Sequence, residues 1–169
     1  ITPETVKKFN NLGFSISIEE KYAEHLGIND EIFKNSGAII KSKKQEILEK
    51  SDIILKVNFP SEDEVNAIKN KSILIGQFDF NIDKAIISKL IKKEVKIFSL
   101  NLLPRITRAQ SMDVLSSQAN LAGYKAVIES FANFEKAIPM MMTAAGTVPA
   151  AKVLIIGAGV AGLQAIATA

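Results

Sequence analysis

The sequence lacks cysteine and tryptophan entirely, and it has one histidine, His25, among its 169 residues. Without cysteine, the chain can form no disulfide framework, no thiolate metal site and no cysteine nucleophile. A single histidine leaves almost no room for a histidine metal cluster or a Ser-His triad. The net charge of +3 is also too small to indicate a nucleic-acid-binding surface. We therefore expect no metal and no nucleic acid, and look for a site for a small molecule or cofactor.

The first hundred residues alternate between short apolar runs and helical patterns. The runs predict strands of a parallel sheet, most of them buried on both faces, and lie at 14–18, 52–57, 72–76 and 95–100. The helical patterns lie at 3–11, 42–50, after the capping residue Ser61, and at 83–93. This alternation predicts an α/β fold with a doubly wound parallel sheet.

After residue 113 charged side chains become rare. One long connecting helix is expected over 111–137, with Ser111 as its N-cap and Asp113 in its first turn. A linker-like stretch follows at 139–149, and a new strand is expected to begin near Lys152. The chain opens without methionine and closes inside a helical pattern, so we expect truncation at both ends and no signal peptide.

A glycine-rich turn separates that strand from the last helical pattern. It has the form G-x-G-x-x-G and consists of Gly157, Ala158, Gly159, Val160, Ala161 and Gly162. Between a strand and a helix, this pattern is typical of a dinucleotide site, where the backbone N–H groups of the helix start hold the pyrophosphate. The alternatives are a purely structural turn and, less favoured, a membrane span over the uncharged stretch 153–169. The acidic residue that would hold the ribose is expected beyond residue 169.

These patterns predict three parts. We expect an N-terminal α/β domain at 1–110, a connecting helix and linker at 111–150, and the start of an NAD-binding Rossmann domain at 151–169.

Arginine occurs only at Arg105 and Arg108, in a chain with 21 basic side chains. A guanidinium is planar, permanently charged and a forked donor, so it holds a carboxamide, phosphate or carboxylate in an orientation that lysine does not fix. Asp113 is close enough in sequence to pair with either arginine. A ligand-binding loop and an ion pair that only fixes the start of the helix are equally open interpretations.

Lys56 ends the apolar run at 52–57. Ligands of open α/β sheets bind at the carboxyl ends of strands, so this lysine is a candidate to hold an anionic substrate. Because most lysines are exposed, a solvated strand end is the favoured interpretation.

The run from Arg105 to Tyr124, together with the run from Met140 to Pro149, resembles the family of alanine dehydrogenases and proton-translocating NAD(P) transhydrogenases. The similarity is to the NAD-binding alpha subunit of the transhydrogenases, and it extends over nearly the whole chain. Residues 3–13 resemble the tail of the shared N-terminal signature, whose upstream part is absent here.

The resemblance implies two α/β domains joined by long helices, with NAD(H) in the cleft. It implies a catalytic loop beside the nicotinamide, formed by Arg105, Gln110 and Asp113. It also implies cofactor contacts from Ser116, from the pyrophosphate turn Gly157 to Gly162, and from the intervening positions Ile106, Thr107, Arg108, Ser111 and Met112.

The implied reaction is hydride transfer from NADH to NADP⁺, which is held on a separate NADP(H)-binding component. A membrane-spanning component couples this transfer to proton translocation. Direct hydride transfer requires oriented rings and excluded water rather than a general acid, which suits a chain with one histidine. The resemblance also implies a homodimer, attached through its partner subunits to the cytoplasmic face of the inner membrane.

One departure separates the two branches of the family. Alanine dehydrogenases use a lysine and a histidine near the substrate; Lys56 matches the lysine, but Gln77 stands at the histidine position. Glutamine is neither an acid nor a base, so this difference favours transhydrogenase over oxidative deamination of alanine. A non-catalytic fragment is the third interpretation.

Overall fold

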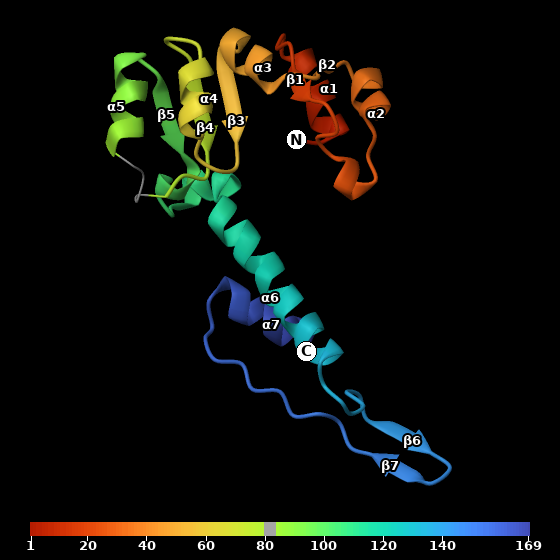
Figure 1. The fold of residues 1–169 in the computed structure, drawn as a ribbon. Coiled ribbons are helices and arrows are strands. Elements are labelled where there is room, and N and C mark those ends of the chain that lie inside the picture. Colours follow the sequence, from red (N-terminus) through yellow and green to blue (C-terminus); the bar gives the residue numbers. More distant parts are fainter. Residues whose placement is uncertain (80–83) are drawn as a thin grey trace. The chain divides into compact units, whose positions relative to one another are not determined.

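The computed structural model describes residues 1–79 and 84–169 (Figure 1). The chain divides into two compact units, which we call unit 1 (Ile1–Ser99) and unit 2 (Leu100–Ala169). Each unit has its own secondary structure and packing.

Unit 1 alternates parallel strands with helices. Its strands within the described residues are β1 (Ser17–Glu19), β2 (Ile39–Lys41), β3 (Ile53–Lys56), β4 (Ile73–Gly76) and β5 (Lys96–Ser99). Its helices there are α1 (Pro3–Asn11), α2 (Asp30–Asn35), α3 (Lys44–Lys50), α4 (Glu62–Ala67) and α5 (Lys84–Lys92), with a 3₁₀ turn, η1 (Glu24–Leu26). Strand β1 pairs with β2, and β3, β4 and β5 form a sheet in that order, with every pair parallel. The predicted α/β class with parallel sheets is confirmed.

Two buried clusters hold unit 1 together. The larger packs Leu74 of β4 with Val65 of α4 and Leu90 of α5, and all three side chains are fully buried. The smaller surrounds Val6 of α1 and Phe33 of α2. Each such side chain contributes about 1.5–3 kcal/mol through its removal from water.

Burial in the three-stranded sheet is one-sided at β3. Ile54 is 5% exposed, whereas its neighbours Ile53 and Leu55 are 40% and 55% exposed. The expectation that the apolar runs are buried on both faces is therefore wrong for this strand. Successive side chains point to opposite faces, and the larger cluster covers only one of them.

Several helix boundaries follow directly from capping chemistry. Thr2 accepts a hydrogen bond from the Thr5 N–H at the start of α1, which covers the predicted residues 3–11. Ser61 caps α4, as its position in the sequence indicates. The predicted start of the next helix at residue 83 lies outside the described residues, and α3 begins two residues later than predicted. Helix α2 and strand β2 were not predicted.

Unit 2 is built around one long helix. Its elements are η2 (Leu100–Leu102), η3 (Thr107–Met112), α6 (Val114–Ala132), β6 (Met141–Thr143), β7 (Gly146–Val148) and α7 (Val160–Thr168). Helix α6 packs along α7 (Figure 1). The contact is close because Gly123 of α6 has no side chain; a Cβ there would lie 2.1 Å from the carbonyl oxygen of Ala161.

Helix α6 is shorter than predicted. It runs over 19 residues, about 28 Å at 1.5 Å per residue, rather than over 111–137. Ser111 lies in the 3₁₀ turn η3, and the side chain of Asp113 accepts the hydrogen bond that caps the helix. Asp113 is thus the N-cap and not a first-turn residue.

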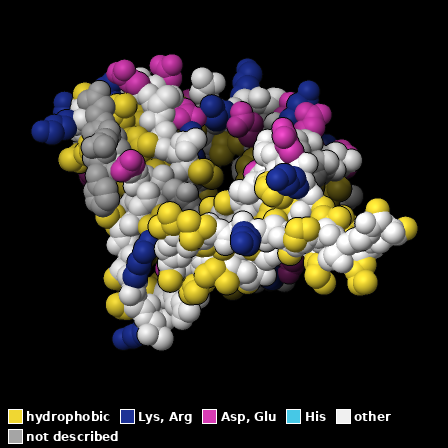
Figure 2. All heavy atoms as spheres, turned by 90° about the horizontal axis from the view of Figure 1, so that it is seen from below, with side chains coloured by type: hydrophobic (Ala, Val, Ile, Leu, Met, Phe, Trp, Pro, Cys, Tyr) yellow, Lys and Arg dark blue, Asp and Glu magenta, His cyan; other side chains and the backbone are white. Residues whose placement is uncertain are grey.

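The stretch expected to be a linker forms an antiparallel hairpin. Strands β6 and β7 pair from Met141 with Val148 to Thr143 with Gly146. Gly146 has φ of +125°, which favours glycine at the end of this turn. The stretch 137–151 has no charged residue, and Met142 of the hairpin is 86% exposed. Figure 2 shows hydrophobic side chains gathered on one face of the molecule.

The strand expected at 152–156 is not formed. These residues carry no regular secondary structure, and Leu154 and Ile156 are 85% and 92% exposed. A strand requires a hydrogen-bonded neighbour, and the described residues place none beside this segment. Within the described parts of the chain, no helix combines the length and the apolar character needed to cross a bilayer.

Candidate functional site

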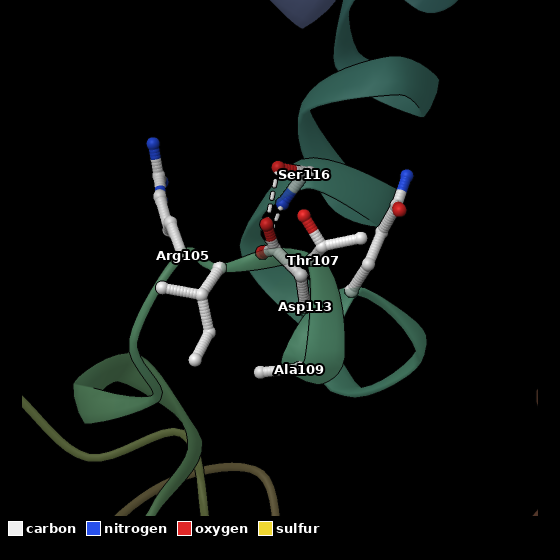
Figure 3. A pocket seen from close by; sticks show the side chains of 7 residues that line it. Arg105, Thr107, Ala109, Asp113 and Ser116 are labelled. Atoms are coloured by element: carbon white, nitrogen blue, oxygen red, sulfur yellow. Dashed lines mark hydrogen bonds between the residues drawn. The ribbon is translucent and has the colours of Figure 1, made fainter.

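An open pocket of about 310 Å³ lies at the start of α6, within unit 2 (Figure 3). Its lining residues come from the segment around Arg105 and Arg108, which we call the arginine loop, and from the start of the helix. They are Arg105, Ile106, Thr107, Ala109, Gln110, Asp113 and Ser116. The folding of η3 back toward α6 brings these side chains together. Six of the seven were predicted as site residues from the sequence.

Asp113 anchors the pocket to the helix. Its Oδ1 accepts a hydrogen bond from the Ser116 N–H at 2.9 Å, and its Oδ2 accepts one from the Ser116 hydroxyl at 2.6 Å (Figure 3). These two bonds, supported by the positive charge of Arg105, lower the pKa of Asp113 below its ordinary value. The carboxylate is therefore ionised and fixed in orientation near neutral pH.

The arginines are not paired with this carboxylate. Within the part of the chain that the structure describes, neither Arg105 nor Arg108 forms an ion pair with Asp113, although the sequence allows both. Figure 3 shows the Arg105 side chain apart from the bonded Asp113–Ser116 pair. Both oxygens of the Asp113 carboxylate instead accept hydrogen bonds from Ser116. The exposed guanidinium of Arg105 is left available for a ligand.

The remaining predicted residues of the loop lie on η3 outside the lining. Arg108, Ser111 and Met112 are exposed, and they are not among the residues that line the pocket. Ala109 lines it and was not predicted; it is 6% exposed and forms part of the pocket wall. Its position directly before Gln110, which also lines the pocket, was the available signal.

The glycine turn is the second candidate element of unit 2. Gly157 has φ of +109°, a conformation that side chains rarely adopt, and Gly159 is the N-cap of α7. A Cβ on Gly162 would lie 2.1 Å from the carbonyl oxygen of Gly157, so the third glycine lets the helix fold against its own turn. Gly159 has open space around it, and as a cap it offers no side chain to the first N–H groups of α7.

Lys56 is neither a free ligand group nor a solvated strand end. Its Nζ lies 2.7 Å from Oε1 and 2.6 Å from Oε2 of Glu64 in α4. Burial alone would raise the pKa of Glu64, but hydrogen bonds from Lys56, Lys44 and the Ser61 N–H outweigh it and lower the pKa to about 2. The sequence places Glu64 in the acidic first turn after the cap Ser61, at the spacing of a capping box, but its pairing with Lys56 was not predicted.

The chain matches one protein family over almost all of its length. Residues 1–122 match the family described as "Alanine dehydrogenase/PNT, N-terminal domain", and residues 126–169 match its C-terminal domain. The chain is 45% identical over 174 aligned residues to the first part of the NAD(P) transhydrogenase subunit alpha of Rhodospirillum rubrum, covering 100% of this chain and 45% of that protein. It is also 40% identical over 168 residues to the NAD(P) transhydrogenase subunit alpha of Haemophilus influenzae, covering 99% of this chain and 32% of that protein.

Two solved structures are similar to this chain. The crystal structure of transhydrogenase from Sinorhizobium meliloti superposes with a TM-score of 0.91 at 46% identity, covering 99% of this chain and 50% of that one. An L-alanine dehydrogenase shares the fold, with a TM-score of 0.78 at 18% identity, over 99% of this chain and 46% of that one. The chain thus spans between about a third and a half of the length of these transhydrogenase relatives. On this evidence the chain belongs to the alanine dehydrogenase/PNT family, and membership of this family implies NAD binding.

Proposed function

We propose that this chain forms the NAD(H)-binding part of a proton-translocating NAD(P) transhydrogenase. In this proposal a hydride passes from NADH to NADP⁺ held on a partner component. The observation that carries the proposal is the pocket at the start of α6, where Gln110 and an unpaired Arg105 stand beside a fixed Asp113. The similarity to transhydrogenase alpha subunits over the whole chain supports it.

The residues of unit 2 fit a dinucleotide. The turn from Gly157 to Gly162 leaves the backbone uncovered where a pyrophosphate would approach, because Gly159 has no atom within 4 Å of its Cβ position. Helix α7 starts at this turn, so its first N–H groups and the positive end of its dipole would hold the phosphates. The bound cofactor would supply the hydride at its nicotinamide ring.

The loop residues would then orient the ring. The forked guanidinium of Arg105 and the amide of Gln110 are suited to a carboxamide, which carries both an acceptor and donors. Asp113 contributes by fixing the loop to α6 through Ser116. Ile106 and Thr107 line the same pocket and would help to exclude water. No side chain has to exchange a proton with the ring, because a hydride transfer moves no proton at this step.

Other features of the assembly are part of the same proposal. We expect NADP(H)-binding and membrane-spanning partner components, a homodimer, and a position at the cytoplasmic face of the inner membrane through those partners. The division into an N-terminal domain at 1–110, a connecting region at 111–150 and the start of a nucleotide-binding domain at 151–169 is also proposed. We also propose that Arg108, Ser111 and Met112 contact the cofactor.

Substitutions in the intact transhydrogenase test this function. Arg105→Ala and Gln110→Asn are expected to slow hydride transfer by about 10²-fold, because orientation of the ring is lost. NADH affinity is expected to change less than tenfold, since the pyrophosphate contacts remain. Stopped-flow transfer rates and isothermal titration with NADH measure the two quantities separately, and Lys136→Ala serves as an exposed control in unit 2. Unchanged transfer rates would contradict the assigned role of the loop.

Oxidative deamination of alanine is the second candidate, supported by the shared fold and by Lys56. It requires a free lysine and an acid or base nearby, whereas Lys56 is paired with Glu64 and Gln77 follows β4. NADH oxidation that depends on both pyruvate and ammonia would favour this candidate over transhydrogenation.

A further inference from the structure

Helix α6 contacts the glycine turn directly at Gly123. This glycine is buried in the middle of α6, and a Cβ there would lie 2.1 Å from the carbonyl oxygen, 2.9 Å from the carbonyl carbon and 3.0 Å from the Cα of Ala161. Ala161 lies inside the turn from Gly157 to Gly162 and belongs to the start of α7. The backbone that would hold the pyrophosphate therefore lies against the backbone of α6, and Figure 1 shows the two helices side by side.

The local backbone of α6 does not require a glycine at this position. Gly123 lies within the helix and does not have a positive φ, unlike Gly146 and Gly157. Glycine destabilises the interior of a helix relative to alanine, because it loses more conformational freedom on folding. The contact with Ala161 accounts for the glycine instead. Any side chain would overlap a backbone carbonyl, which cannot rotate away as the end of a flexible side chain can.

The same helix holds the arginine loop at its N-terminal end. Asp113 caps α6, and both of its carboxylate oxygens accept hydrogen bonds from Ser116. Between Ser116 and Gly123 the helix contains neither proline nor an additional glycine, the residues at which helices most often kink. The pocket around Arg105 and the glycine turn are thus both attached to one continuous stretch of helix, and both lie in unit 2.

We propose that Gly123 is a positioning residue for the hydride transfer. By letting the backbones of α6 and the glycine turn touch, it places the arginine loop where it reaches the nicotinamide ring of a cofactor whose pyrophosphate is held on the turn. The inference rests on the proposed function and gives a role in it to a residue that does not line the pocket.

The size of the effect follows from the overlap at Gly123. A methyl group there would push the turn away from α6 by about 1.3 Å, the difference between 2.1 Å and an ordinary contact of 3.4 Å. A misplacement of about 1 Å between reacting groups can lower a rate by about 10²-fold. The pyrophosphate contacts move together with the turn, so we expect them to survive the displacement.

Gly123→Ala in the intact transhydrogenase tests the proposal. NADH reaches both the turn and the arginine loop, whereas ADP-ribose has the pyrophosphate but lacks the nicotinamide ring. We expect the transfer rate at saturating NADH to fall by about 10²-fold. The affinity for ADP-ribose, measured by isothermal titration, is expected to stay that of the wild type. Ala122→Leu enlarges the exposed neighbour in the same helix and is expected to leave both quantities unchanged.

A second variant covers the case in which Gly123→Ala does not fold. Ala165 is 8% exposed and lies one turn beyond Ala161 in α7, so Ala165→Val also forces α7 away from α6 and leaves α6 itself unchanged. This variant is expected to slow the transfer less than Gly123→Ala does, again with the affinity for ADP-ribose retained.

A normal transfer rate in folded Gly123→Ala, or in Ala165→Val if the first variant does not fold, would overturn the proposal. An equal loss of ADP-ribose affinity would also overturn it, because general damage to the turn would then explain the slower transfer. Arg105→Ala is measured alongside. If it slows the transfer and Gly123→Ala does not, the positioning role alone fails; if neither does, the proposed role of the loop fails as well.

Discussion

The two units of the chain are stabilised in different ways. Unit 1 encloses fully buried side chains such as Leu74, Phe33 and Val6 between its strands and helices. In unit 2, all of whose residues are described, the buried apolar side chains are Ala109, Val127 and Ala165. Unit 1 thus obtains its order from large side chains, whereas unit 2 depends on glycines, a capped helix and close backbone approach. The candidate cofactor elements lie in the unit with the weaker core.

The largest effect is expected when an apolar side chain is removed from each unit in turn. Leu74→Ala is expected to lower the free energy of unfolding of unit 1 by about 2–5 kcal/mol, because it leaves a cavity in a fully buried cluster. Leu154→Ala in unit 2 removes an equally large side chain that is 85% exposed, and it is expected to cost under about 0.5 kcal/mol. Hydrogen exchange of amides in each unit measures the two effects, and equal losses would contradict the comparison.

Acid provides a second test, because the strongly shifted carboxyl group belongs to unit 1. The pKa of Glu64 is lowered to about 2 in the folded chain from an ordinary value of 4.5, so its contribution is complete above pH 4.5. That contribution is lost as the pH falls from 4.5 toward 2, and amounts to about 3 kcal/mol. Urea unfolding of unit 1 between about pH 3 and 6 should show the first part of this loss in the wild type. Glu64→Gln should flatten the dependence, whereas Glu62→Gln should leave it steep.

In the glycine turn, two similar substitutions are expected to differ in their effects on stability and on NADH binding. Gly162→Ala places a methyl group 2.1 Å from the Gly157 carbonyl, so we expect a loss of about 1–3 kcal/mol in stability together with weaker NADH binding. Gly159→Ala has open space and is expected to change stability by less than about 0.5 kcal/mol. In the intact protein it should still weaken NADH binding about tenfold, because the methyl group meets the pyrophosphate. Normal NADH affinity in Gly159→Ala would remove the turn from the proposed site.

The smallest expected effect concerns the start of α6. Asp113→Ala removes the hydrogen bonds to Ser116 and is expected to cost about 0.5–2 kcal/mol, the usual contribution of an N-cap. Ser117→Ala is the matched control, because its hydroxyl only donates to the Asp113 backbone carbonyl. Helix content by circular dichroism and urea unfolding report both. Equal effects of the two substitutions would show that the carboxylate does not cap the helix.

Most helices and strands of unit 1 could be predicted from the sequence, because the residues that indicate them are close together in the chain. Pro3 at the first helical position and the pair of Ser61 with an acidic first turn are recognisable without tertiary contacts, and both predict helices that the structure contains. The apolar runs that became β3, β4 and β5 were equally readable. Strand β2 was missed because Ile39–Lys41 is short and acquires its pairing only from the distant β1.

Unit 2 was harder to predict because its structure depends on contacts between side chains and backbone. Asp113 could not be identified as the cap in place of Ser111 without the geometry of η3. The hairpin was concealed by two prolines and an uncharged composition, and only Gly146 signalled a turn. The residues of the pocket were nevertheless found, because scarce arginines and family resemblance singled out one loop. Their roles toward NAD(H) stay predictions.

The close approach of α6 to α7 at Gly123 fixes the spacing between two elements of the candidate site. The helix begins at the Asp113 cap and meets Ala161 ten positions later, about 15 Å along its axis at 1.5 Å per residue. One inserted residue between these points would rotate the glycine by about 100° and turn a bulky face toward α7. The register of this single helix therefore sets how far the arginine loop stands from the phosphate turn, and evolutionary insertions are expected on either side of this segment rather than within it.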